Sequence, residues 1–247
     1  MRLLIINYHV IDEIAHVISK LNIPQDNFTN TEYFPPPNAP PELVANYFFF
    51  MVAIDHRTGA PDFTFEGYVN NKFYHGTDLL YRLAMRKFFE NPKFFSAENM
   101  SKLCSEDIAK WLSVESPRRL SVRDPVVRAR LLNDAGKKLL MLYDGSALNI
   151  IRDSGGHLYT ELGTGFIDRL KVFVSYQDPV EKKPFLLVKF LERRGLLRIR
   201  DPKNVKVPVD NHLTRIALRL GIVEPEKDLI TYFMRNSKIE VDPEFDA

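Results

Sequence analysis

Cysteine is nearly absent from this sequence, which has only Cys104 among its 247 residues. One thiol cannot close a disulfide within the chain, nor can it supply the ligands of an iron–sulfur cluster or a Cys-rich zinc site. Disulfide-stabilised secreted folds and cysteine-based metal centres are therefore excluded. We expect a reducing cytoplasm as the location, no cofactor, no metal, and a buried packing role for Cys104.

An excess of charge of one sign is also missing. Lys and Arg number 34 against 32 Asp and Glu, so the formal net charge is +2. A strongly basic chain would indicate a wide surface for binding polyanions, and this total does not. A local basic patch is compatible with a balanced total, so the charge neither excludes nor demonstrates nucleic acid as a partner.

Long hydrophobic runs are lacking too. The apolar run at the N-terminus breaks at Asn7 and His9, without the apolar stretch and small-residue cleavage site of a signal peptide. The most apolar window, residues 44–54, is about half as long as a membrane-spanning helix. We therefore expect neither secretion nor a membrane partner.

The residues that are present predict a mainly α fold with one small β-hairpin. Hydrophobic residues are 45% and charged residues 27% of the chain, as in ordinary globular proteins. Helical spacing of apolar residues predicts a helix over 10–21, and the run that begins at Pro41 is apolar on all sides, which indicates a buried helix. Asn70-Asn71 tolerates positive φ and predicts the turn of the hairpin. Further helices are expected over 77–88, 97–104, 106–112, 125–143, 147–152, 157–162, 166–174, 179–194, 211–220 and 226–233.

The prolines predict the domain organisation. Residues 34–41 contain five prolines and read as a rigid connector, because proline disrupts helices and central strands. We expect an N-terminal helix and connector over 1–41. A helical domain over 42–247 would follow, with two subdomains flanking a central cleft, in a monomeric protein.

The stretch over 165–223 carries the pattern with most chemical content. Two predicted helices meet at Tyr176-Gln177-Asp178-Pro179, and the second has Lys182 and Lys183 near its start. Further on, Val207-Pro208-Val209-Asp210 leads into a helix whose N-cap is Asp210.

This order of residues resembles the helix-hairpin-helix DNA glycosylase superfamily. The resemblance implies a helical fold in which a hairpin delivers a lysine nucleophile and a later helix start delivers a catalytic aspartate. Val209-Asp210-Asn211-His212 matches the helix start, so Lys182 and Asp210 become the implied catalytic pair. Residues 176–181 stand where most of the family has an apolar-Pro-Gly-Val-Gly loop.

Two subfamilies are similar over more of the chain. Archaeal 8-oxoguanine DNA glycosylases are similar over 167–223, including a second lysine, Lys189, seven residues after Lys182. Queuosine-salvage nucleoside hydrolases are similar, in the same order, at the helix that ends in Ile54-Asp55-His56, at the hairpin, and over 127–150. Their aromatic Asn-Phe-x-Phe-Trp signature is replaced here by residues 54–58.

The chemistry of base release explains why these residue types matter. Positive charge builds on the sugar as a base departs, so a fixed carboxylate such as Asp210 lowers the barrier electrostatically. A lysine amine whose pKa is lowered by burial or by a neighbouring cation attacks the same carbon. Successive helical residues point apart, so only one of Lys182 and Lys183 is expected to face the site.

Each candidate also has a plain structural interpretation. Asp210 could be a helix cap only, and both lysines could be solvated. Phe49 could stack on a flipped base or simply belong to the core. Asp55, His56, Lys183 and His212 are candidate substrate-binding residues or parts of helix ends. Arg193, Arg194, Arg198 and Arg200 are candidate phosphate contacts, whereas such clusters, like Arg118, Arg119, Arg123 and Arg128, are usually solvated.

The sequence thus favours an N-glycosidase, most simply a DNA glycosylase that excises a modified purine from damaged duplex DNA by base flipping, with lyase activity through Lys182. One alternative is hydrolysis of a free modified nucleoside or its 5′-monophosphate. The other is a non-catalytic nucleic-acid-binding protein that keeps the fold.

Overall fold

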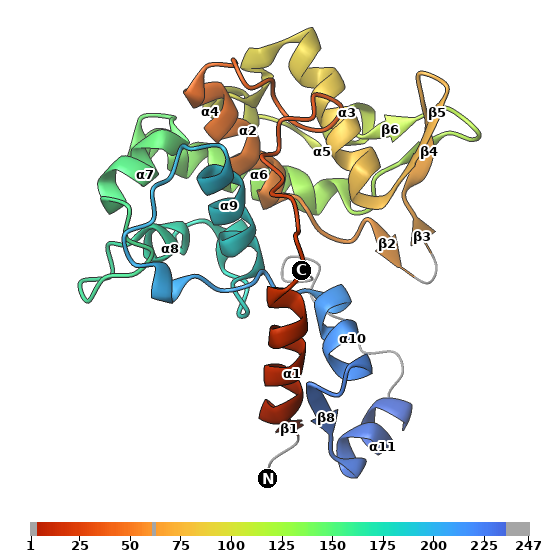
Figure 1. The fold of residues 1–247 in the computed structure, drawn as a ribbon. Helices are drawn as coiled ribbons and strands as arrows, with labels where there is room; N and C mark the ends of the chain where they lie inside the picture. Colours follow the sequence, from red (N-terminus) through yellow and green to blue (C-terminus); the bar gives the residue numbers. More distant parts are fainter. Residues whose placement is uncertain (1–3, 61–62, 236–247) are drawn as a thin grey trace. The chain divides into compact units, whose positions relative to one another are not determined.

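The computed structural model describes residues 4–60 and 63–235, and it is mainly helical with small antiparallel sheets (Figure 1). The mainly α class is therefore confirmed. The longer helices are α1 (Tyr8–Ser19), α2 (Pro41–Ala53), α3 (Gly76–Glu90), α6 (Pro125–Tyr143) and α9 (Lys182–Arg193). The shorter ones are α4 (Ala97–Met100), α5 (Ser105–Trp111), α7 (Ala147–Ser154), α8 (Phe166–Leu170), α10 (Asn211–Arg219) and α11 (Lys227–Arg235), with 3-10 turns η1 (Pro92–Phe95), η2 (Val174–Tyr176) and η3 (Pro202–Asn204).

The chain divides into two compact units. Among the described residues, one unit joins 4–25 to 209–235, and the other comprises 26–208. The first unit holds α1, α10 and α11, with β1 (Leu4–Ile6) paired antiparallel to β8 (Val223–Pro225). The proline-rich connector predicted as part of residues 1–41 lies inside the second unit, so the units do not separate at residue 41.

The hydrophobic core belongs to the unit over 26–208, and α2 lies at its centre. Every residue from Val44 to Ala53 is buried, as the all-round apolar pattern predicts. Phe48 stacks on Phe190 of α9 with ring centroids 4.7 Å apart. Neighbouring contacts tie α2 to α6, α7 and η1 as well. A buried helix enclosed in this way must have its end carbonyls satisfied by the protein itself.

The predicted hairpin is confirmed. Strands β4 (Glu66–Val69) and β5 (Lys72–His75) pair antiparallel, and Asn70 and Asn71 both have positive φ, as a tight primed turn requires. Two shorter pairs were not predicted, because two-residue strands carry no periodicity: β2 (Gly59–Ala60) with β3 (Phe63–Thr64), and β6 (Ser113–Val114) with β7 (Leu120–Ser121).

Some local predictions are corrected. Residues 157–162 are irregular rather than helical, and Gly155, Gly156 and Gly163 hold positive φ on either side of them. Cys104 is exposed rather than buried, since it starts α5, where its backbone N–H donates to Asp107 at 3.0 Å. Within the described residues, no helix is both long and apolar enough to cross a membrane.

Candidate functional site

Three cationic side chains, those of Arg128, Lys182 and Lys183, donate hydrogen bonds at the C-terminal end of α2. Arg128 of α6, which is fully buried, donates from Nη1 to the carbonyl of Ile54 and from Nη2 to that of His56. Lys183 Nζ donates to Ala53 O at 3.2 Å, and Lys182 Nζ to Asp55 O at 3.4 Å. The last carbonyls of a helix lack intrahelical partners and carry partial negative charge, so positive donors stabilise them.

The turn over 178–181, directly before α9, directs Lys182 and Lys183 towards the end of α2. Glu181 holds a left-handed φ of 56° directly before the helix. Asp178, which is buried, accepts the backbone N–H of Lys182 at 2.5 Å and that of Lys183 at 3.4 Å through Oδ2. An aspartate that accepts the first N–H groups of a helix fixes where the helix begins. The first turn of α9 is thereby anchored against the end of α2.

Lys183 is the more deeply buried of the two lysines. It is 1% exposed, whereas Lys182 is partly exposed. Burial lowers the pKa of Lys183 to about 8, and the adjacent charge of Lys182 acts in the same direction. The neutral amine is therefore more accessible to Lys183 than to a solvated lysine.

His56 lies against the Lys183 amine. Its Nδ1 is 3.4 Å from Lys183 Nζ, and the residue is 3% exposed. Burial lowers the pKa of His56 well below its usual value, and the charges of Arg128 and Lys183 lower it further. His56 Nε2 is buried and has no hydrogen-bond partner among the described residues.

Two carboxyl groups border the cluster. Asp55 is buried and accepts from the hydroxyl of Tyr81 at 3.4 Å. Burial raises the pKa of the Asp178 carboxyl, although the Lys182 and Lys183 N–H groups oppose the shift. Lys182, Lys183, Asp55 and His56 thus form one site, which we call the lysine cluster.

A second network of contacts, centred on Glu181, holds the turn before α9 in place. Glu181 accepts from the hydroxyl of Tyr159 at 2.6 Å and from Lys206 Nζ at 2.8 Å, and it pairs with Lys171 at 3.3 Å. Hydrogen bonds from Lys206 and Tyr159 lower the pKa of Glu181 against the effect of burial. A non-glycine residue at positive φ costs energy, and these three partners offset it.

The structure brings four of the predicted site residues together and places two elsewhere. Asp55, His56, Lys182 and Lys183 meet in the unit over 26–208, whereas Asp210 and His212 lie in the other unit. Asp210 is the N-cap of α10, and its Oδ1 accepts the N–H of His212 and of Leu213, each at 2.9 Å. The cap role is therefore present, and a pocket shared by Lys182 and Asp210 stays a prediction.

Phe49 and Arg194 have structural roles in this conformation. Phe49 is fully buried, with its ring stacked on Tyr176 at 5.3 Å. Arg194 donates to the carbonyls of Phe28, Pro35 and Pro36 at 3.0, 2.8 and 2.9 Å, and so binds the proline-rich connector rather than presenting its guanidinium to solvent. Base stacking by Phe49 and phosphate contact by Arg194 have no support here.

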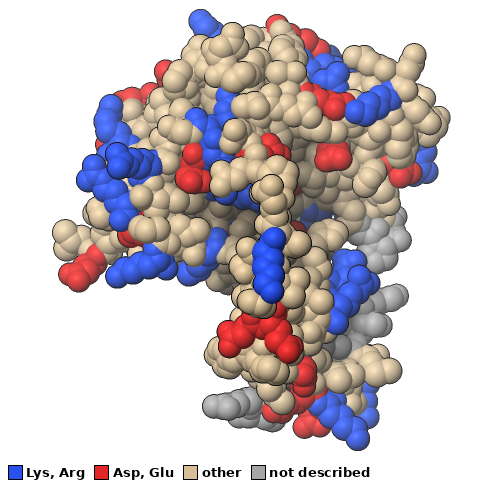
Figure 2. Space-filling model, in the orientation of Figure 1, with Lys and Arg blue, Asp and Glu red and all other residues tan. Residues whose placement is uncertain are grey.

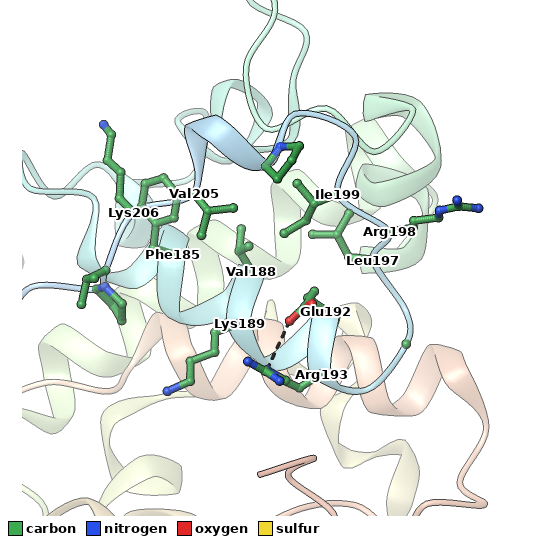
Figure 3. Close-up of a pocket in the computed structure, with 14 residues that line it drawn as sticks. Phe185, Val188, Lys189, Glu192, Arg193, Leu197, Arg198, Ile199, Val205 and Lys206 are labelled. Carbon is green, nitrogen blue, oxygen red and sulfur yellow. Dashed lines mark ion pairs between the residues drawn. The ribbon is translucent and has the colours of Figure 1, made fainter. Parts of the chain in front are cut away.

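Of the other three arginines, Arg193 and Arg198 line an open groove of about 750 Å³ along α9. Figure 3 shows Phe185, Val188, Leu197, Ile199 and Val205 gathered in the groove while Arg198 points away from them. Arg193 pairs with Glu192 at 3.3 Å, and Arg198 and Arg200 are exposed. On the face in Figure 2, Lys and Arg are interspersed with Asp and Glu and form no continuous stripe.

Sequence reasoning missed Arg128 and Asp178. Arg128 was expected to be solvated, yet it shares a helix face with Leu132, Ala135 and Leu139, all buried. That spacing at positions i, i+4, i+7 and i+11 was the available evidence for burial. Asp178 lies in the turn recognised from the sequence, but a capping role cannot be told from sequence alone.

The described residues include no group of three or more His, Cys, Asp or Glu side chains able to hold a metal ion. Neither a scan against protein-family models nor a search of curated proteins finds a match for this chain.

Proposed function

We propose that the protein cleaves an N-glycosidic bond and that Lys183 supplies the amine nucleophile. The observation that carries the proposal is the burial of the Lys183 amine at the start of α9, 3.2 Å from Ala53 O and 3.4 Å from His56 Nδ1. The resemblance to helix-hairpin-helix glycosylases implies Lys182, one residue earlier, as the nucleophile. Burial favours Lys183 over its neighbour Lys182, because desolvation is what makes an amine nucleophilic at neutral pH.

The reaction follows from these groups. The neutral amine attacks C1′ of the sugar, the electrons of the N-glycosidic bond leave with the base, and a Schiff base forms after the sugar ring opens. Asp210 keeps the role that the resemblance implies, as the carboxylate that stabilises charge on the sugar. Lys182 donates to the carbonyl of Asp55, two residues after the end of α2.

We favour a modified purine in damaged duplex DNA as the substrate. A lysine nucleophile is of use where the enzyme continues to a lyase step, and the exposed Arg198 and Arg200 offer phosphate contacts. A free modified nucleoside or its 5′-monophosphate is the alternative, favoured by the near-zero net charge.

Borohydride trapping tests the proposal. A duplex with one abasic site, incubated with the protein and borohydride, should give a covalent adduct because reduction fixes the Schiff base. Lys183→Ala should abolish the adduct, and Lys182→Ala should retain most of it. The adduct is measured by gel shift, and the modified lysine is located by mass spectrometry.

Three outcomes speak against parts of the proposal. An adduct on Lys182 would return the nucleophile to the other lysine. Base release without any adduct would indicate water as the nucleophile. Neither release nor adduct, together with binding to duplex DNA, would leave the non-catalytic nucleic-acid-binding protein.

A further inference from the structure

The Lys183 amine has two hydrogen-bond acceptors, and only one of them can take a proton. Ala53 O, at 3.2 Å, is a backbone carbonyl. His56 Nδ1, at 3.4 Å, is an imidazole nitrogen. Lys183 is an ammonium donor to both in its charged form, so Nδ1 accepts and the proton of neutral His56 resides on Nε2. That nitrogen is the one that is buried without a partner among the described residues.

We propose that His56 is the proton relay of Lys183, taking a proton at Nδ1 and giving one to the departing base from Nε2. This inference rests on the proposed function and adds a second catalytic residue to it. A buried polar atom without a partner calls for an explanation, and transfer of the Nε2 proton to the departing base would supply one.

The protons and electrons balance. The Lys183 ammonium loses a proton to Nδ1, and its lone pair forms the bond to C1′. The pair of the N-glycosidic bond moves to the base nitrogen, which takes the proton from Nε2. His56 ends neutral with its proton on Nδ1, the base leaves neutral, and the positive charge stays on the lysine nitrogen now bound to C1′.

The surrounding charges make the protonated form of His56 short-lived, so that a proton taken up by the ring is soon released. Arg128, Lys182 and Arg57 disfavour a charge on His56, while Asp55 and Asp178 lie near enough to the lysine to favour its charged form. The low basicity of the imidazole makes Nε2 a strong proton donor once Nδ1 has taken a proton, and the lowered pKa of Lys183 reduces the cost of that first transfer.

The first test reads the tautomer without any substrate. Nitrogen chemical shifts of the His56 ring in the full-length protein should show an unprotonated Nδ1 and a protonated Nε2 at neutral pH. The opposite tautomer, or a ring protonated on both nitrogens, would overturn the relay because Nδ1 would have no free lone pair.

The second test separates two steps with two duplex probes. An abasic-site duplex needs only the amine, whereas a duplex with one 8-oxoguanine also needs a leaving group to be protonated. His56→Asn keeps an acceptor for Lys183 but cannot relay a proton. Above pH 8 the Lys183 amine is neutral without the help of a base. There, borohydride trapping on the abasic duplex should persist in His56→Asn, while release of 8-oxoguanine falls by roughly 10²-fold to 10⁴-fold.

The controls keep the relay and the proposed function distinguishable. His9→Asn changes an exposed histidine on α1 and should leave both steps intact. Equal loss of both steps in folded His56→Asn would show that the histidine only positions the lysine. A wild-type protein inert on both probes would refute the proposed function and, with it, the relay.

Discussion

At the scale of single residues, Lys183 is held in its place at a cost to stability. Its ammonium is buried beside Lys182 and Arg128, and its partners at 3.2 and 3.4 Å are a carbonyl and a neutral imidazole. Removing a charge from water costs free energy unless an opposite charge compensates it. Groups that reduce stability in this way are concentrated at functional sites.

This cost gives a pH-dependent prediction. The pKa of Lys183 is about 8 in the folded protein against 10.5 for a free side chain. Between these values the unfolded chain binds more protons, so wild-type stability rises with pH. Below pH 8 the buried charge of Lys183 lowers the free energy of unfolding by about 3 kcal/mol. Lys183→Met should therefore be more stable than wild type at pH 7, by a margin that shrinks towards pH 10.

Urea unfolding of both proteins at the two pH values measures the margin. Lys189→Met, an exposed position of the same helix, is the control and should show no such trend. A margin that stays constant between pH 7 and pH 10 would contradict a lowered pKa for Lys183.

Residue types alone located much of this site. Lys182, Lys183, Asp55 and His56 were each candidates from the sequence, because lysines at a hairpin and polar residues after an apolar helix are recognisable patterns. Their meeting at the end of α2 was not predictable, since it depends on how α2 and α9 pack. The choice of Lys183 over Lys182 depends on burial, which neighbouring positions in a sequence cannot reveal.

At the scale of elements, the contacts between α2, α6 and α9 provide hydrogen-bond donors for the backbone carbonyls at the end of a buried helix. Helix α2 ends inside the core, and cations of α6 and α9 donate to the carbonyls of Ala53, Ile54 and His56 at and just after its end. The helix predicted to begin at Pro41 and the helix predicted over 125–143 were recognised because their apolar residues and first-turn prolines are local features. The contact between them is not local, and Arg128 was misjudged for that reason.

Arg128 tests this interpretation. Arg128→Met keeps the apolar stem but leaves the carbonyls of Ile54 and His56 buried without their donors. We expect a loss of about 3 kcal/mol or more, because unpaired buried polar groups retain their full desolvation cost. Chemical denaturation measures the loss, and Lys137→Met at an exposed position of α6 should stay within about 0.5 kcal/mol of wild type. Unchanged stability of Arg128→Met would mean that these carbonyls have other donors.

At the scale of the whole molecule, the lysine cluster and the predicted aspartate belong to different compact units. The core lies in the unit over 26–208. In the other unit α1 and α10 have no buried residue within the described part of the chain. Sequence reasoning expected a boundary at the proline-rich connector, because prolines often mark linkers. Here Arg194 and the core bind that connector, so it belongs to the larger unit.

Whether the substrate is a polymer or a monomer depends on the whole binding surface. The salt dependence of binding distinguishes the two. Binding to duplex DNA releases counterions, so the affinity should fall with salt with a log–log slope near −0.9 for each phosphate contacted. Arg198→Gln with Arg200→Gln should flatten the slope by about 1 for each phosphate that is no longer bound, without changing which base is released, because phosphate contacts position and base contacts specify. Fluorescence anisotropy with an abasic duplex at several salt concentrations measures the slope.

The effect of removing charge as such must be separated from the effect of removing a specific phosphate ligand. Lys93→Gln with Lys137→Gln removes the same charge from exposed positions on η1 and α6, and it should change the slope much less. A wild-type protein that binds no duplex at about 50 mM salt, yet hydrolyses a free nucleoside or its monophosphate, would refute the DNA substrate. The buried Lys183 amine would then be the nucleophile towards a small molecule, because the lysine cluster itself contains no group that requires a polymer.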